Sequence, residues 1–138
     1  MIGLLVVTHG GLAAELVEAA LRIVQQPAPV KALALDWDHD IAEGCRQIEA
    51  AVAELDQGDG IIIATDMLGG TPANVAMTFL EPGQVEVVTG VNLPMLIKFS
   101  NLRGESDLTA VASLLADKGR SHITVASEIL TGRKEGEK

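Results

Sequence analysis

Short, almost uninterrupted apolar runs recur along the first two thirds of the chain. They lie at residues 1–8, 30–35, 60–65 and 85–89. Runs without apolar–polar alternation are typical of strands that are covered on both faces, as in a parallel sheet. The pattern therefore predicts four buried strands.

Between these runs the apolar positions return every three or four residues, which is the period of an amphipathic helix. The segments with this period are 12–24, 41–55, 95–99 and 108–119. A short helix is also expected after the third strand, with Thr71 as its N-cap and Pro72 at its first position. Strands that alternate with helices predict βαβ units.

We therefore predict an α/β fold, a doubly wound and mostly parallel four-stranded sheet flanked by helices, with the flavodoxin-like strand order 2-1-3-4. One domain is expected over residues 1–130, followed by a polar C-terminal tail at 131–138. The β-prone segment 121–127 predicts a last strand near the end of the domain.

Composition narrows the class of function. With 138 residues, of which 48 % are hydrophobic, the chain can form a core, so intrinsic disorder is excluded. The net charge of −9, from 10 basic and 19 acidic residues, argues against a nucleic-acid binder but allows a partner with a basic surface. Cys45 is the single cysteine, which excludes a disulfide within the chain. Without a basic signal-peptide region or an apolar run of membrane-spanning length, a cytoplasmic protein is expected.

Two polar residues follow two of the predicted strands. His9 ends the first run, and Asp66 comes directly after the third. If the first and third strands are neighbours, the two side chains meet where ligands bind in open α/β sheets. A carboxylate can hold one ring N–H of a histidine and leave the other nitrogen as a nucleophile. Taken singly, His9 could be a structural histidine and Asp66 a turn former or helix cap.

The loop after Asp66 carries features that suit an anion. Gly69 and Gly70 allow a tight turn, and Thr71 stands where a helix opens. Free N–H groups and the positive end of a helix dipole would face an anion there. Met67 and Leu68 lie in the same loop, where apolar side chains either pack under the loop or form a docking patch.

Two further residues have open interpretations. Trp37 is either part of the core or a contact that a loop offers to a partner. His39 stands in an acidic loop, at helical spacing from Glu43, where a metal site is conceivable but a solvated loop is the simpler interpretation. We predict no metal site.

Three motifs connect the chain to a known family. They are Thr8-His9-Gly10, Asp66-x-x-Gly-Gly-Thr-Pro-x-Asn74 and Gly90-Val-Asn-Leu-Pro-Met-Leu96. In this order they closely resemble the mannose-family enzyme IIA (EIIA type-4) domain of the bacterial phosphoenolpyruvate-dependent sugar phosphotransferase system (PTS). The likeness runs from Met1 to about Val125.

The resemblance implies a phosphotransferase with a phosphohistidine intermediate. A histidine of the family takes a phosphoryl group from the phosphocarrier protein HPr and passes it to an enzyme IIB partner, and this histidine falls on His9. The supporting aspartate falls on Asp66. The small residues that face the phosphate fall on Gly69, Gly70 and Thr71, where the family often has serine.

The resemblance also implies a doubly wound α/β fold, usually in a homodimer whose C-terminal strand crosses to the other subunit. That strand falls on residues 122–126. No cofactor is implied, and the membrane is reached only through the transporter complex. No IIB domain is expected after the last predicted strand.

Two other classes of function compete with a phosphocarrier. A regulatory module would keep His9 but use its phosphorylation state to control partner binding. A flavin or nucleotide binder fits the strand order, but the loop after the first strand lacks the hydroxyl-rich cradle that a flavin phosphate needs. Only Trp37, Phe79 and Phe99 could stack on a ring system.

Overall fold

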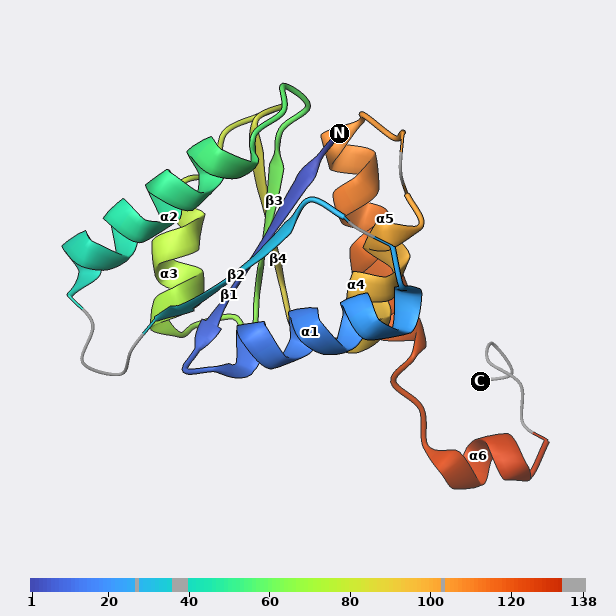
Figure 1. Cartoon of the computed structure of the whole chain (residues 1–138). Helices are drawn as coiled ribbons and strands as arrows, with labels where there is room; N and C mark the ends of the chain where they lie inside the picture. Colours follow the sequence, from blue (N-terminus) through green and yellow to red (C-terminus); the bar gives the residue numbers. More distant parts are fainter. Residues whose placement is uncertain (27, 36–39, 103, 133–138) are drawn as a thin grey trace.

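The computed structural model describes residues 1–26, 28–35, 40–102 and 104–132, which form a parallel sheet covered by helices (Figure 1). Its strands are β1 (Gly3–His9), β2 (Val30–Leu35), β3 (Ile61–Thr65) and β4 (Val85–Thr89). They lie in the order β2-β1-β3-β4, and every adjacent pair is parallel. The predicted fold class and strand order are confirmed.

Helices cover both faces of the sheet (Figure 1). They are α1 (Leu12–Val24), α2 (Ile41–Leu55), α3 (Thr71–Met77), α4 (Leu93–Ser100) and α5 (Leu108–Ser121). One face packs against α2 and α3, and the other packs against α1, α4 and α5. This arrangement follows from the right-handed βαβ crossover, which carries successive helices to opposite faces when the strand order reverses.

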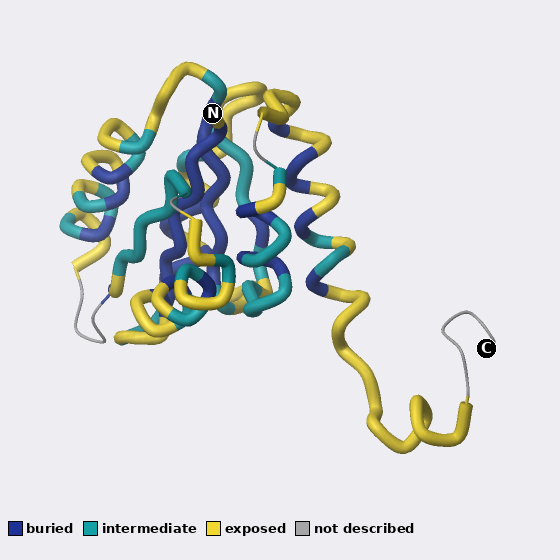
Figure 2. Tube along the Cα trace, turned by 45° about the vertical axis from the view of Figure 1, so that its right-hand side comes forward, coloured by how far each residue is buried: buried dark blue, intermediate teal, exposed yellow. Residues whose placement is uncertain are grey.

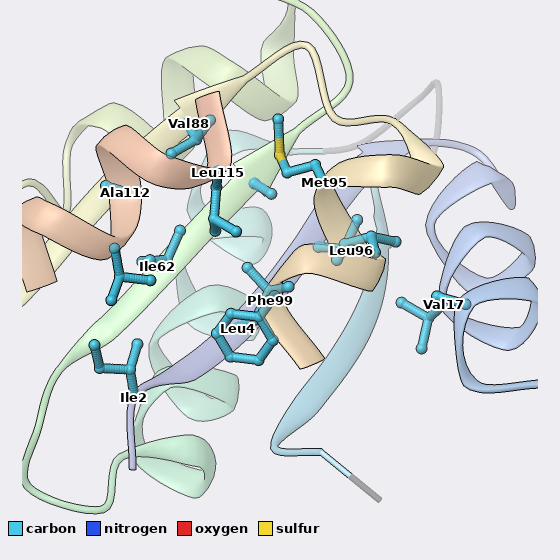
Figure 3. Close-up of a cluster of buried hydrophobic side chains, with 14 of the residues drawn as sticks. Ile2, Leu4, Val17, Ile62, Val88, Met95, Leu96, Phe99, Ala112 and Leu115 are labelled. Atoms are coloured by element: carbon cyan, nitrogen blue, oxygen red, sulfur yellow. The ribbon is translucent and has the colours of Figure 1, made fainter. Parts of the chain in front are cut away.

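The alternation of side chains along β1 divides the core into two clusters. Leu4 and Val6 point to the cluster under α1, α4 and α5, whereas Leu5 and Val7 point to the cluster under α2 and α3. Figure 3 shows the first cluster, to which Leu4 of β1 and Phe99 of α4 both belong. Burial of each such side chain contributes about 1.5–3 kcal/mol. The two clusters together fix β1 at the centre of the sheet.

The start of α3 differs from the prediction. Gly70 occupies the N-cap position, and Thr71 is the first helical residue, with its side chain exposed. The predicted N-cap role of Thr71 is therefore wrong. The N-cap position requires a glycine here, because a larger residue at position 70 would collide with His9, as described below.

The C-terminal segment also differs. Residues 123–125 join no strand, and the helix α6 (Ala126–Leu130) follows them, so the predicted strand at 122–126 is wrong for the single chain. Figures 1 and 2 show this arm standing away from the body, and no residue of α6 is buried. A β-prone sequence forms a strand only where it pairs with a neighbouring strand, and residues 123–125 pair with none of the four strands. Exchange of this segment between two subunits stays a prediction.

Candidate functional site

The carboxyl ends of β1 and β3 bring His9 and Asp66 together. The ring Nδ1 of His9 lies 2.7 Å from Oδ2 of Asp66, and the backbone N–H of His9 donates to the same oxygen at 3.0 Å. The two residues are 57 positions apart in the sequence. Their proximity, predicted from the strand order, is confirmed. Because an ionised carboxylate can only accept, this contact places a proton on Nδ1.

The surroundings of Asp66 keep its carboxyl group ionised. Burial raises the pKa of Asp66, but the hydrogen bonds from the His9 ring and backbone outweigh burial, so this pKa lies below its ordinary value. The side chain is 13 % exposed, against 25 % for His9. Its second oxygen, Oδ1, accepts from the backbone N–H of Met67 at 3.1 Å. With both oxygens engaged, the carboxylate is fixed in one orientation.

A buried hydroxyl holds the turn that carries His9. Oγ1 of Thr8 accepts from the backbone N–H of Ala13 at 2.7 Å, in the first turn of α1. Gly10 adopts a φ of 54°, a left-handed conformation that favours glycine. This role of Thr8 is not predicted by the motif that contains it. A hydroxyl residue at the end of a buried strand, just before a helix, is the signal that could have indicated the role.

Gly70 touches the ring of His9. A Cβ added at Gly70 would lie 2.6 Å from Cε1 and 3.0 Å from Nε2 of that ring. The φ of Gly70 is −103°, which any residue can adopt, so the need for glycine here is steric. Gly69 is the opposite case, because its φ is 93° and an added Cβ would meet nothing within 4 Å. The loop therefore packs against the Nε2 edge of the imidazole.

The remaining predicted residues fall into two groups. Met67 and Leu68 are 54 % and 68 % exposed, so they do not pack under the loop. Trp37 and His39 lie outside the described residues. Among the residues that are described, no group of His, Cys, Asp and Glu side chains could hold a metal ion. In the same part of the chain, no helix has the length and apolar character needed to cross a membrane.

Comparison with known proteins places the chain in a family. The sequence model of the family described as "PTS system fructose IIA component" matches residues 3–115. The chain belongs to the mannose-type PTS enzyme IIA family. The resemblance that the three motifs carried is thereby confirmed, and with it the assignment as a IIA component of a sugar phosphotransferase system.

Individual proteins that resemble this IIA domain are also PTS components. It is 25 % identical over 124 residues to the PTS mannose-specific EIIAB component of Escherichia coli K12, covering 88 % of this chain but 38 % of that protein. It is 25 % identical over 131 residues to the PTS fructose-specific EIIA component of Bacillus subtilis, and the match covers 94 % of this chain and 90 % of that protein. The crystal structure of a PTS IIA protein associated with a fucose utilization operon of Streptococcus pneumoniae superposes with a TM-score of 0.80, at 28 % identity over 94 % and 96 % of the two chains.

Proposed function

We propose that this IIA domain is a cytoplasmic phosphocarrier, which accepts a phosphoryl group from phospho-HPr on His9 and passes it to an enzyme IIB partner during sugar uptake. The observation that carries the proposal is the contact between Nδ1 of His9 and the carboxylate of Asp66. Membership of the PTS IIA family supports the same class of reaction.

The contact defines the chemistry of each residue. With its proton on Nδ1, His9 presents the lone pair of Nε2 as the nucleophile. Nε2 attacks the phosphorus in line, and the new N–P bond forms as the bond between phosphorus and the donor histidine breaks. Positive charge develops on the imidazole, and the carboxylate of Asp66 stabilises it. The reverse steps deliver the phosphoryl group to the IIB partner.

The loop of Gly69, Gly70 and Thr71 is the proposed phosphate-binding element. Gly70 packs against the Nε2 edge of His9, so a phosphoryl group on this nitrogen would lie beside the loop. Residues 8–11 and 66–74 contain no lysine or arginine. An incoming carrier with a basic surface would supply the missing cation, and the exposed Met67 and Leu68 would form part of its docking surface.

Phosphorylation in a purified system tests the proposal. We expect phosphoenolpyruvate, enzyme I and HPr to load one phosphoryl group per chain, and NMR of the product to place it on Nε2 of His9. Failure of the folded protein to accept the group would overturn the phosphocarrier function, and attachment to Nδ1 would overturn the proposed arrangement. Onward transfer to a purified IIB protein separates a relay from a purely regulatory module.

Asp66→Asn is expected to slow transfer from phospho-HPr by roughly two to four orders of magnitude. The amide has one accepting oxygen where the carboxylate has two. If that oxygen faces His9, the NH₂ group meets the N–H of Met67. If the amide turns around, it donates to Nδ1 and moves the ring proton to Nε2, the nitrogen that must attack. Rapid-quench kinetics measures the loss.

The matched control for this substitution is Asp107→Asn. Asp107 is the N-cap of α5, where its side chain accepts from Ala110 N–H at 3.1 Å. Asparagine caps a helix about as well as aspartate, so this variant should transfer at the wild-type rate. A rate for Asp66→Asn within twofold of the wild type would contradict the role given to Asp66.

We also propose that the domain forms a homodimer through its C-terminal arm, residues 122–130. Ile123, Val125, Ile129 and Leu130 are all more than half exposed. The strand β4 ends the sheet on one side, and an open groove of about 310 Å³ lies between β4 and α5. An edge strand can accept a further strand through its unpaired backbone groups, which would bury these apolar side chains.

Light scattering tests the dimer. We expect about twice the 14.4 kDa chain mass for the full chain at micromolar concentration, and the single-chain mass after deletion of residues 122–138. Because no residue of α6 is buried, the deletion should leave the rest of the domain folded. A full-length chain that scatters as a monomer would rule out the exchange.

A further inference from the structure

The basic side chains of this acidic protein are distributed unevenly. Of the Lys and Arg residues in the described part of the chain, Arg22, Lys31, Arg46 and Arg120 each pair with a carboxylate. Lys98 and Lys118 are the two described Lys or Arg residues without such a pair, and no described side chain bonds to their ammonium groups. Both lysines line the same pocket.

The pocket lies between α4 and α5 and has a volume of about 390 Å³, within the size range of small-molecule sites. Leu93, Ile97 and Lys98 of α4 form one wall, together with Asn101, the C-cap of that helix. Lys118 and His122, one helical turn apart at the end of α5, form the other wall. No residue that lines the pocket is acidic.

Two contacts hold the walls in place. Asn92 caps α4 by accepting from the backbone N–H of Met95 at 3.2 Å, and its amide donates to the carbonyl of Gly119 in α5 at 3.0 Å. An added Cβ at Gly119 would lie 3.1 Å from Cε of Met95, so the helices approach closely here. A pocket between walls fixed in this way is already formed before a ligand arrives, which lowers the cost of binding.

We propose that this pocket binds a small dianion, a phosphomonoester or a dicarboxylate with a compact carbon skeleton. Two ammonium groups without carboxylate partners match two negative charges. The Asn101 amide and the His122 ring can add hydrogen bonds, and the Leu93 and Ile97 side chains suit the carbon skeleton. Because His122 begins the C-terminal arm, an occupied pocket would link the arm to α4.

Titration of the full, unphosphorylated chain tests the site by NMR at constant ionic strength. The probes are glucose 6-phosphate and succinate, with glucose as the uncharged control. We expect saturable shifts of the amides at 93–101 and 118–122 for at least one dianion, with a dissociation constant on the order of 0.1–1 mM, and none for glucose. The probe that saturates identifies the class of ligand.

Matched variants separate the pocket from the general charge of the protein. Lys98→Met and Lys118→Met should each weaken binding roughly tenfold, whereas Lys98→Arg keeps the positive charge and should retain most of it. Lys31→Met changes the net charge equally, but Lys31 pairs with Glu54 outside the pocket, so binding should not change. The dispersion of each amide spectrum confirms that the variant is folded.

Three results would overturn the site. These are shifts that do not saturate by 20 mM with either dianion, a loss in Lys31→Met equal to that in the pocket variants, and shifts confined to residues 9 and 66–71. Shifts that do not saturate would also be expected if a second copy of the chain covers the pocket. Shifts confined to residues 9 and 66–71 would assign the anion to the phosphoryl site. The titration needs no phosphoryl donor, so its failure and failure of the phosphocarrier proposal are separate results.

Discussion

His9→Ala is expected to lower phosphoryl transfer from phospho-HPr by at least about 10⁴-fold, to the background of the assay. The substitution removes the nucleophilic nitrogen itself, and no other described histidine lies beside a carboxylate as His9 lies beside Asp66. The fold should survive, because His9 is only half-buried at the end of β1. The measurement is uptake of label from phosphoenolpyruvate through enzyme I and HPr.

The variant retains His39 and His122, so the assay distinguishes His9 from the other two histidines as the acceptor. Label that persists at the wild-type level on folded His9→Ala would place the phosphoryl group on another residue. Circular dichroism and the melting temperature provide the control for folding. Alanine keeps the backbone N–H that donates to Asp66, so only the ring hydrogen bond is lost, which should cost about 1–3 kcal/mol of stability. A folded but unlabelled variant supports the proposed acceptor.

Gly70→Ala is the second substitution with a large expected effect. The added methyl group would lie 2.6 Å from Cε1 and 3.0 Å from Nε2 of His9, so either the ring or the loop must move. A displacement of about 1 Å at a reacting atom can cost roughly 10²-fold in rate, and we expect at least this loss in transfer from phospho-HPr. Rapid-quench kinetics measures the rate, and the chemical shifts of the His9 ring report the displacement.

Two other glycines provide controls for this steric effect. Gly11 has a φ of −83° and an open Cβ position, so Gly11→Ala should leave the rate unchanged. Because Gly11 is the N-cap of α1, where glycine is preferred to alanine, the substitution should cost up to about 1 kcal/mol of stability. Gly69→Ala meets open space but has a φ of 93°, so it should cost about 1 kcal/mol of stability through backbone strain. Equal rate losses in Gly11→Ala and Gly70→Ala would show that contact with the His9 ring is not the cause.

The sequence was sufficient to predict the sheet and the central pair of the site. Buried parallel strands are apolar on both faces, so their runs stand out, and the strand order places residues 9 and 66 at the same edge. From that order the proximity of His9 and Asp66 follows without any knowledge of loop geometry. The family motifs then added the roles that remain to be tested.

Other features depend on geometry that a sequence pattern does not carry. The contact between Gly70 and the His9 ring depends on how the loop folds back over β1, and the same fold moves the N-cap from Thr71 to Gly70. The strand predicted at 122–126 does not form in the single chain, because a β-prone segment becomes a strand only when it pairs with a neighbouring strand. The names of the relatives mention mannose, fructose and fucose, so membership of the family does not identify the sugar.

The central position of β1 has a consequence for how the protein folds. β1 can pair with β2 early, because residues 3–35 contain both strands, but its pairing with β3 must close a loop of more than fifty residues, and such closures are slow steps. His9 meets Asp66 only across this second pairing. During refolding, the capacity to accept a phosphoryl group should therefore appear together with the completed sheet. A kinetic intermediate that holds only β1, α1 and β2 would be inactive.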